Sequence, residues 1–408
     1  MFLNGDVKEI FMNILVICET FSKTGPTSMC LLSVVNEAVK RGHRCRVVSA
    51  AGVVFDSKVS LEYKNSSDLE TKNEKKGLLS RLKRIITPFL RYFTWPDDPF
   101  SDLDFFYHAV AKEIDADRPD IVICSVGSLH NICISNRIKD KHPDIKCVPY
   151  FLDSILGGAK LRIMPKSLHN KRAVRYEERY LKNADSIVMM KYVEEKYRSL
   201  AQLPSYFSKI KFLDLPLYNP ENHSVVTEHK HFGPNAINMF FAGSMPKNIR
   251  DPRFVLSVFQ RVKRPDLNLY IAGTSYYQED LDSLAKNDSR VHLLGVTPHE
   301  TVLEMMNEAD ILLSIGNNLD CMIPCKIFEY MSTGKPILAT YKRETDPSIE
   351  YFSFYKNSLL LDEKTDLEDA SKQIESFLMC VKENKKKELV DALYNNTPAA
   401  FCEYVETI

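Results

Sequence analysis

The stretch Ile323-Pro-Cys-Lys-Ile-Phe-Glu-Tyr-Met-Ser-Thr-Gly-Lys-Pro-Ile-Leu-Ala339 predicts a short helix that leads into a buried strand. Pro324 presets φ for a helix start, Gly334 suits the left-handed cap that ends a helix, and Pro336 prevents the helix from continuing. A loop that enters a helix N-terminus offers free N–H groups and the positive end of the helix dipole, which together suit a diphosphate. Glu329 lies about one turn into the helix. Its carboxylate could accept hydrogen bonds from a pair of ribose hydroxyls.

The length and composition indicate a globular protein of two or three domains. The chain has 408 residues, of which 44% are hydrophobic. Its 54 basic residues balance 54 acidic ones, so the overall charge gives no reason to expect nucleic acid as a partner. The ten cysteines are scattered and several lie in apolar runs, which is typical of a reducing compartment. Cys321 and Cys325 lack the spacing and the nearby histidines of a zinc site, so we expect no metal. We also expect a cytoplasmic protein, because no apolar run reaches the roughly 18 residues of a membrane span and the N-terminus lacks a signal peptide.

Apolar runs alternate with helical patterns along the whole chain, which predicts an α/β protein with two doubly wound parallel sheets. The first sheet is predicted from runs near residues 13–18, 45–49, 119–124, 146–151 and 184–189. The second is predicted from runs near 237–242, 267–272, 291–294, 309–314 and 336–339. The proline-containing stretch Leu215–Asn235 reads as the linker. We therefore expect a first domain over residues 1–215, a second over 216–385 and a closing helical segment over 386–408.

Residues 324–336 read P-x-K-x-F-E-Y-M-x-x-G-K-P and resemble the nucleotide-sugar-binding helix of GT-B glycosyltransferases, specifically the retaining family 4-like enzymes. The resemblance implies two Rossmann-like domains that face each other across a cleft, with the nucleotide sugar on the second domain. It implies that the closing helix crosses back to the first domain. The implied activity is transfer of the sugar, with retention, to a hydroxyl acceptor such as a lipid-linked or surface-glycan precursor. No cofactor or metal is required.

The resemblance also assigns donor-side roles to loops of the second domain. The basic residue that contacts the diphosphate is expected at Arg250 or, second, at Lys247. Backbone groups near Val296 are expected to read the nucleobase. Arg250 and Lys326 would stabilise charge on the leaving diphosphate. The full set of predicted nucleotide-binding residues is Gly243, Ser244, Lys247, Arg250, Gly273, Val296, Pro324, Cys325, Lys326 and Glu329.

One position departs from the family pattern. The family's Glu-x7-Glu motif places an acid eight residues before Glu329, where this chain has Cys321. That acid normally lies near the donor sugar. Asp320, Asn317 and Asn318 are the candidates to replace it.

In the first domain, three residues are predicted on the acceptor side. Gly25 is all that remains of the family's glycine pair, and a helix-capping loop is an equal interpretation. Asp153 follows a predicted strand and is a candidate for acceptor alignment in catalysis, although a turn aspartate fits equally well. His130 could face the cleft, but a packed or surface histidine is the more common role.

The segment Lys72–Trp95 carries seven basic residues and one acidic residue, Glu74, for a net charge of +6. Apolar and aromatic side chains are interspersed with the charges. This composition is typical of a helix that lies on an anionic membrane surface, here the inner face. An amphipathic helix packed on its own domain is the alternative.

Three other functions compete with sugar transfer. A sugar-nucleotide epimerase shares the GT-B fold, and a non-catalytic nucleotide-sugar-binding protein would explain Cys321. A nicotinamide-dependent oxidoreductase is disfavoured, because no G-x-G-x-x-G follows Val16 and no acidic residue ends the second strand near Ser49.

Overall fold

The computed structural model describes residues 11–22, 25–50, 52–58, 92–96, 103–126, 130–156, 164–221, 230–233, 235–319, 322–380 and 386–408. The chain divides into two compact units. The first unit comprises Met1–Pro216 together with Pro398–Ile408, and the second comprises Leu217–Thr397. The second unit therefore includes residues 386–397, and the return to the first unit begins at Pro398.

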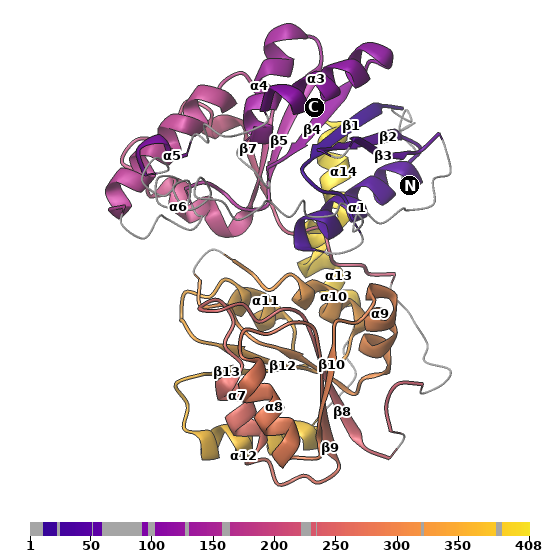
Figure 1. Cartoon of the computed structure of the whole chain (residues 1–408), viewed down its shortest axis with the longest axis vertical. Coiled ribbons are helices and arrows are strands. Elements are labelled where there is room, and N and C mark those ends of the chain that lie inside the picture. Colours follow the sequence, from indigo (N-terminus) through magenta and orange to yellow (C-terminus); the bar gives the residue numbers. More distant parts are fainter. Residues whose placement is uncertain are drawn as a thin grey trace, which may run out of the picture. The chain divides into compact units, whose positions relative to one another are not determined.

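The first unit is built on a seven-stranded sheet in the order β3-β2-β1-β4-β5-β6-β7 (Figure 1). The strands are β1 (Asn13–Cys18), β2 (Arg44–Ser49), β3 (Gly52–Asp56), β4 (Ile121–Ser125), β5 (Lys146–Phe151), β6 (Ile187–Met190) and β7 (Ile210–Leu213). The helices are α1 (Pro26–Lys40), α3 (Leu103–Ala116), α4 (His130–Lys141), α5 (Lys166–Leu181), α6 (Glu194–Arg198) and α14 (Pro398–Glu406). Short 3-10 helices span Lys191–Val193 and Phe207–Lys209.

The interior of this sheet follows from the apolar runs of its strands. Residues Ile14–Cys18 of β1 are almost fully buried, as expected for a parallel strand covered on both faces. All neighbouring strands run parallel except β3, which is antiparallel to β2. This edge strand was not predicted. It follows a tight return in which Gly52 has φ 110°, a conformation that glycine adopts without a side-chain clash.

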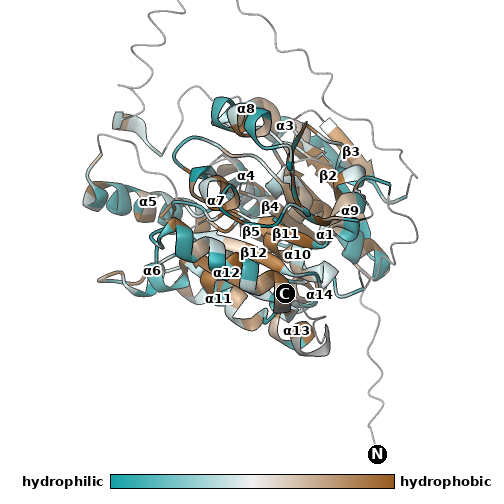
Figure 2. Ribbon diagram, turned by 90° about the horizontal axis from the view of Figure 1, so that it is seen from below, coloured by the Kyte–Doolittle hydropathy of each residue, from teal (hydrophilic) through white to brown (hydrophobic). Residues whose placement is uncertain are grey.

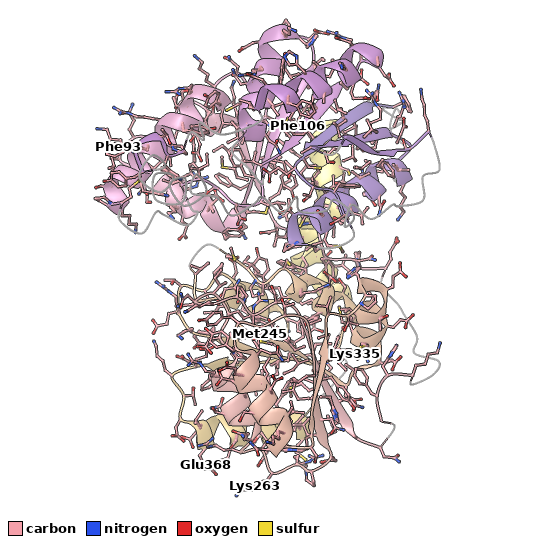
Figure 3. All side chains as sticks on the ribbon, in the orientation of Figure 1. Phe93, Phe106, Met245, Lys263, Lys335 and Glu368 are labelled. Carbon is pink, nitrogen blue, oxygen red and sulfur yellow. The ribbon has the colours of Figure 1, made fainter. Side chains whose placement is uncertain are left out.

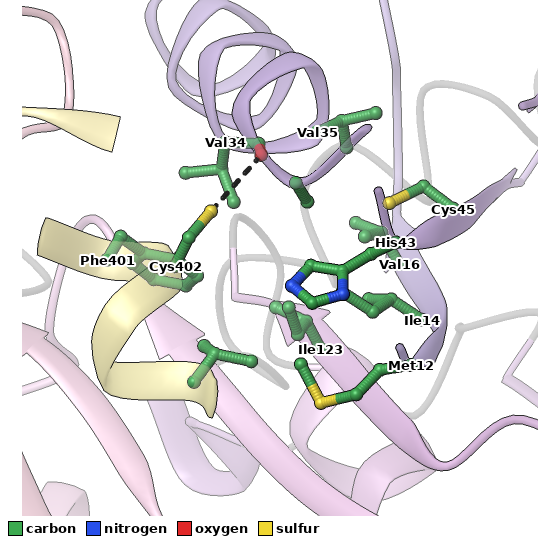
Figure 4. A pocket seen from close by; sticks show the side chains of 12 residues that line it. Met12, Ile14, Val16, Val34, Val35, His43, Cys45, Ile123, Phe401 and Cys402 are labelled. Atoms are coloured by element: carbon green, nitrogen blue, oxygen red, sulfur yellow. Dashed lines mark hydrogen bonds between the residues drawn. The ribbon is translucent and has the colours of Figure 1, made fainter. Parts of the chain in front are cut away.

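Helix α14 packs into the first unit beside α1, where the end of the chain (yellow) meets its beginning (Figure 1). Its residue Phe401 is buried and its ring lies 4.8 Å from that of Tyr150 on β5. A small apolar cavity remains between α1, α14 and β1, and His43 is the polar side chain that lines it (Figure 4). The His43 Nε2 lies 2.9 Å from Glu406 of α14.

The second unit has a six-stranded, wholly parallel sheet in the order β10-β9-β8-β11-β12-β13. Its strands are β8 (Ile237–Ala242), β9 (Leu267–Ala272), β10 (Val291–Gly295), β11 (Ile311–Ser314), β12 (Ile337–Tyr341) and β13 (Ser358–Asp362). Its helices are α7 (Arg253–Phe259), α8 (Gln278–Asn287), α9 (His299–Glu308), α10 (Lys326–Thr333), α11 (Ser348–Phe354), α12 (Leu367–Cys380) and α13 (Lys386–Ala392). A 3-10 helix spans Tyr394–Asn396.

Hydropathy separates the strands from the helices that cover them. In Figure 2, strands β4, β5, β11 and β12 are mostly hydrophobic, whereas α8 is largely hydrophilic. Helix α8 buries only Leu281 and Leu284 against the core of the second unit. The pattern is that of a sheet whose faces are covered by amphipathic helices.

The prediction of two parallel-sheet α/β domains is confirmed. Strands β7 and β13 were not predicted, and the proposed linker is partly structured. Leu215, Leu217 and Tyr218 are buried, while residues 222–229 and Pro234 lie outside the described residues. Within the described ranges, every helix is too short or too polar to cross a membrane.

Candidate functional site

The carboxyl ends of β8, β9 and β10 meet at three glycines. The N–H of Gly243 donates to Ala272 O over 2.9 Å, and the N–H of Gly273 donates to Gly295 O over 2.7 Å. All three have positive φ: 157° at Gly243, 131° at Gly273 and 65° at Gly295. A Cβ on Gly273 would lie 2.0 Å from the carbonyl oxygen of Gly243. The three loops therefore pack backbone against backbone, which only glycine permits at Gly273.

Arg250 follows β8 and lies directly over this glycine edge. Its Nη1 donates to the carbonyl of Ser244 over 2.9 Å, and a Cβ on Gly243 would lie 3.2 Å from the same nitrogen. Its Nε and Nη2 donate to Asn317 Oδ1 over 3.2 and 3.0 Å. Burial lowers the pKa of the Arg250 guanidinium, and nearby groups, Cys325 first, act in the opposite direction. An arginine remains protonated in proteins, so this side chain is a fixed cation.

Asn317 connects Arg250 to the segment that precedes α10. Its side chain is 1% exposed, and its Nδ2 donates to the carbonyl of Met322 over 3.1 Å. The backbone N–H of the next residue, Asn318, donates to Ile249 O over 2.7 Å. Asn317 was one of the candidates to replace the family's first acid. Its amide instead binds protein groups on both sides, while Asp320 and Cys321 lie outside the described residues.

Helix α10 forms where the sequence predicts it. It begins at Lys326 after the N-cap Cys325, and its C-cap Gly334 has φ 74°, as the left-handed cap requires. The N–H of Ile327 donates to Pro324 O over 3.0 Å. Tyr330, predicted only as an apolar contact, also accepts a hydrogen bond from the N–H of Ala242 over 3.0 Å. That bond ties α10 to the end of β8, beside the glycine edge.

The first turn of α10 carries an ion pair. Lys326 Nζ lies 2.6 Å from Glu329 Oε2, and both side chains are largely buried, with 23% and 12% of their surface exposed. Burial raises the pKa of the Cys325 thiol, the charge of Glu329 raises it further, and the cations Lys326 and Arg250 lower it. Three of the four charged residues predicted to contact the nucleotide therefore act on the Cys325 thiol, and Lys247 does not. The structure brings Arg250, Lys326 and Glu329 together at the N-terminus of α10.

Lys247 lies on the same loop as Arg250 but has a different partner. Its Nζ is 4.5 Å from the ring centroid of Tyr276 and 2.5 Å from the Tyr276 hydroxyl. The two loops are joined beneath this pair, because Met245 N donates to Thr274 O and Tyr276 N donates to Met245 O, over 2.8 and 3.0 Å. Met245 itself is buried within the second unit (Figure 3). Tyr276 is 58% exposed, and sequence reasoning missed it because an aromatic residue in a loop has no periodic signal.

Val296 is 80% exposed at the end of β10, directly after Gly295. Its side chain is therefore not held by packing, and the role of the backbone at this turn stays a prediction. Within the described ranges, no three His, Cys, Asp or Glu side chains are grouped so that they could hold a metal ion.

The predicted acceptor-side residues lie at three places in the first unit. Gly25 has φ 92° and is the N-cap of α1, with Met29 N donating to its carbonyl over 3.0 Å. Asp153 is exposed directly after β5. His130 is the first residue of α4, and the structure describes its backbone but not its side chain.

The basic segment Lys72–Trp95 is described only from Tyr92 onward, so its seven charges lie outside the described residues. The ring of Trp95 is stacked on His169 of α5 at 4.3 Å and contacts the core of the first unit. Trp95 therefore belongs to the packing of that unit. Phe93 is 58% exposed.

Residues 236–379 match the family model described as glycosyl transferases group 1. The search of curated proteins finds no match. Among solved structures, HepE from Anabaena in complex with UDP is similar, with a TM-score of 0.60, 11% identity and coverage of 97% of this chain and 100% of that one. Sucrose-phosphate synthase from Thermosynechococcus elongatus gives 0.66 and 10% identity, covering 97% and 98%. A putative UDP-N-acetylglucosamine 2-epimerase from Listeria monocytogenes gives 0.56 and 13% identity, covering 97% and 98%.

The fold and the matched region define the class: this is a GT-B protein whose second unit carries the glycosyl transferases group 1 region. The resemblance predicted from residues 324–336 is confirmed at this level. The matched region contains the glycine edge, Arg250, Asn317 and α10, so the residues that the geometry brings together all lie within it.

Proposed function

We propose that the protein transfers a sugar from a nucleoside diphosphate sugar to a hydroxyl acceptor, and that the second unit holds the nucleotide. The observation that carries this proposal is the grouping of Arg250, Lys326 and Glu329 at the N-terminus of α10. Two cations and a helix N-terminus suit a diphosphate, and a carboxylate one turn into the helix suits ribose hydroxyls. The similarity to a solved structure that binds UDP agrees with this ligand class.

In the proposed reaction, the bond between the anomeric carbon and the phosphate oxygen breaks while a bond to the acceptor oxygen forms. Negative charge then develops on the departing diphosphate. Arg250 and Lys326 stabilise that charge, since fixed cations in a partly buried site need no rearrangement during the reaction. The departing phosphate oxygen takes the acceptor proton, so no separate base and no metal is required. This scheme retains the configuration of the anomeric carbon.

The sharpest test concerns Glu329. Glu329→Gln keeps the size of the side chain but removes the charge that strengthens hydrogen bonds from ribose, so we expect nucleoside diphosphate affinity to fall by about 1.5–3 kcal/mol, or about 10–150-fold. Calorimetric titration with the best-binding diphosphate from a UDP and GDP panel measures this. A 2′,3′-dideoxyribose analogue removes the same contact from the ligand side. Combined with the variant, it should cost little more than either change alone.

The change at Glu329 also leaves Lys326 without its partner, so a matched control is needed. Asp369→Asn breaks a pair of the same spacing on α12, where Asp369 lies 3.7 Å from Lys372 and both side chains are exposed. This control should not alter nucleotide binding. Wild-type affinity in the Glu329 variant would remove the reason for placing the nucleotide at α10. Conversion of the donor alone into an isomer would favour an epimerase, and binding without turnover with any acceptor would favour a non-catalytic protein.

We further propose that the acceptor is a lipid-linked or surface-glycan precursor, reached from the inner membrane face through the segment Lys72–Trp95. The support is the +6 charge of this segment, since each basic residue near an anionic surface contributes about 1 kcal/mol. Sedimentation with phosphatidylglycerol vesicles at low salt should pellet the wild-type protein. A variant in which Lys83, Arg84 and Arg91 are replaced by glutamate should stay in the supernatant with the same vesicles. Equal binding of both proteins would exclude the segment as the docking site.

A further inference from the structure

A buried carboxylate in the first unit holds the segment that follows β5. Glu177 of α5 has no exposed surface. The hydroxyl of Tyr197 lies 2.9 and 3.0 Å from its two oxygens, and the hydroxyl of Tyr206 lies 2.6 Å from Oε2. The backbone N–H groups of Ile155 and Leu156 donate to the same carboxylate. One side chain therefore joins α5 to α6, to the segment after α6 and to the segment after β5.

Among the described residues, the donors to this carboxylate are two tyrosine hydroxyls and two backbone N–H groups, all of them neutral. Burial raises the pKa of Glu177 to about 7, and its hydrogen bonds to the tyrosines and the backbone lower it only in part. None of these influences comes from a cation, and the nearest acid in sequence, Glu178, acts on Tyr206. Burial raises the pKa of both tyrosines, so they remain protonated donors. A buried carboxyl is costly unless its oxygens accept hydrogen bonds, and its removal would leave these four donors unpaired. The acceptor oxygens are therefore the property that this position requires.

The segment held in this way carries Asp153. Leu152, Ser154, Ile155 and Leu156 are buried, and Asp153 is the exposed residue among them. The carbonyl of Leu152 accepts a hydrogen bond from the Tyr192 hydroxyl over 2.6 Å. The Ser154 side chain is hydrogen-bonded to Tyr197. The backbone on both sides of Asp153 is thus held by hydrogen bonds. The residue is exposed, although partial burial of its carboxyl raises the pKa of Asp153.

We infer that Glu177 is a positioning residue: it fixes residues 152–156 so that Asp153 is presented in one orientation to a hydroxyl-bearing acceptor. The identity of that ligand class rests on the proposed function. The fixing of the segment does not, because it follows from contacts within the first unit.

The ionisation of Glu177 makes the segment sensitive to pH. Opening the segment exposes the carboxyl to water and returns its pKa toward the ordinary value of about 4.5. The closed segment then binds the proton more tightly than the open one. By linkage, closure is most favourable below the ordinary pKa and is weakened as pH rises through about 7.

Amide exchange of the full-length protein tests the inference without reference to activity. Glu177→Leu has a similar volume but accepts no hydrogen bond, so two N–H groups and two hydroxyls lose their partner. We expect the protection of the Ile155 and Leu156 amides to fall at least about tenfold. Amides in β4 should keep their protection. Glu177→Gln keeps a carbonyl for the two N–H groups, and its NH2 faces hydroxyls that can rotate to accept. The glutamine variant should keep the protection of the Ile155 and Leu156 amides, and that protection should no longer depend on pH.

Glu195→Gln, the same change at an exposed position of α6, is the control and should match the wild type. Kinetics with an alkyl glycoside as acceptor probe provides the second measurement. The leucine variant should raise the acceptor KM about tenfold with an unchanged donor KM, and the glutamine variant should restore it. Wild-type protection of Ile155 and Leu156 in the leucine variant would overturn the inference, as would an equal loss of protection across the whole sheet. Absence of turnover in the wild type would count against the proposed function alone.

Discussion

Asn317 is the residue whose role differs most from its appearance in the sequence. It lies in a polar run of the sequence, which predicts a contact with the sugar. In the structure it is buried, accepts hydrogen bonds from Arg250 and donates one to the Met322 carbonyl. A guanidinium held by two hydrogen bonds to a rigid partner loses little side-chain freedom when it binds an anion. Asn317 therefore holds the Arg250 guanidinium in one position.

We predict that Asn317→Ala weakens nucleoside diphosphate binding by about 1.5 kcal/mol, or about tenfold, because Arg250 is no longer held in place. Asn318→Ala is the matched control. The backbone N–H of Asn318 donates to Ile249 O, and that hydrogen bond survives the change. Titration calorimetry of both variants checks this. Equal affinities for the two variants would show that Arg250 needs no positioning.

At the level of the elements, the carboxyl edge of β8, β9 and β10 depends on close backbone contact. The Gly243 carbonyl occupies the place where a side chain of Gly273 would begin. Gly295 also has a positive φ, 65° against 131° at Gly273, but a Cβ added there would meet open space. A comparison of alanine substitutions at the two glycines therefore distinguishes a steric clash with the neighbouring loop from the strain of a positive φ.

We predict that Gly273→Ala destabilises the second unit by about 3 kcal/mol or more, because the new Cβ overlaps a backbone oxygen. Gly295→Ala should lower the free energy of unfolding by only about 1–2 kcal/mol, which is the cost of placing an alanine in a left-handed conformation. Urea unfolding of both variants gives the comparison. A cost for Gly273→Ala as small as that for Gly295→Ala would mean that the two loops can separate freely.

The apolar periodicity predicted the parallel sheets well, because a strand covered on both faces must be a continuous apolar run. Strand β1 and strand β8 were found at their predicted bounds for that reason. Strands β3, β7 and β13 were missed because they are partly exposed, with mixed polarity. In the site, the cap at Gly334 was predictable from local chemistry. The Arg250–Asn317 and Glu177–Ile155 contacts were not, since they join residues far apart in the chain and leave no local pattern.

The molecule as a whole consists of two units with separate cores. The first core is incomplete without α14, whose Phe401 and Val405 are buried against it. The second core contains only residues of the second unit. Damage to α14 should therefore remain confined to the first unit.

We predict that Phe401→Ala lowers the stability of the first unit by about 3–5 kcal/mol, because it leaves a cavity beside Tyr150. Unfolding should then show two separate transitions, with the transition of the second unit unchanged. Glu403→Ala, an exposed position on the same helix, should have little effect. If the Phe401→Ala variant unfolds in one transition at a lower denaturant concentration, the two cores are not independent.

The return of the chain at Pro398 has a consequence for synthesis. Helix α14 is the last element that the ribosome makes, so the first unit cannot complete its core until the whole second unit has been translated. During that interval the apolar surfaces of α1 and β1 that α14 later covers remain open to water and to chaperones. A released chain that ends at Thr397 should therefore keep a protease-resistant second unit attached to a first unit that is sensitive to protease.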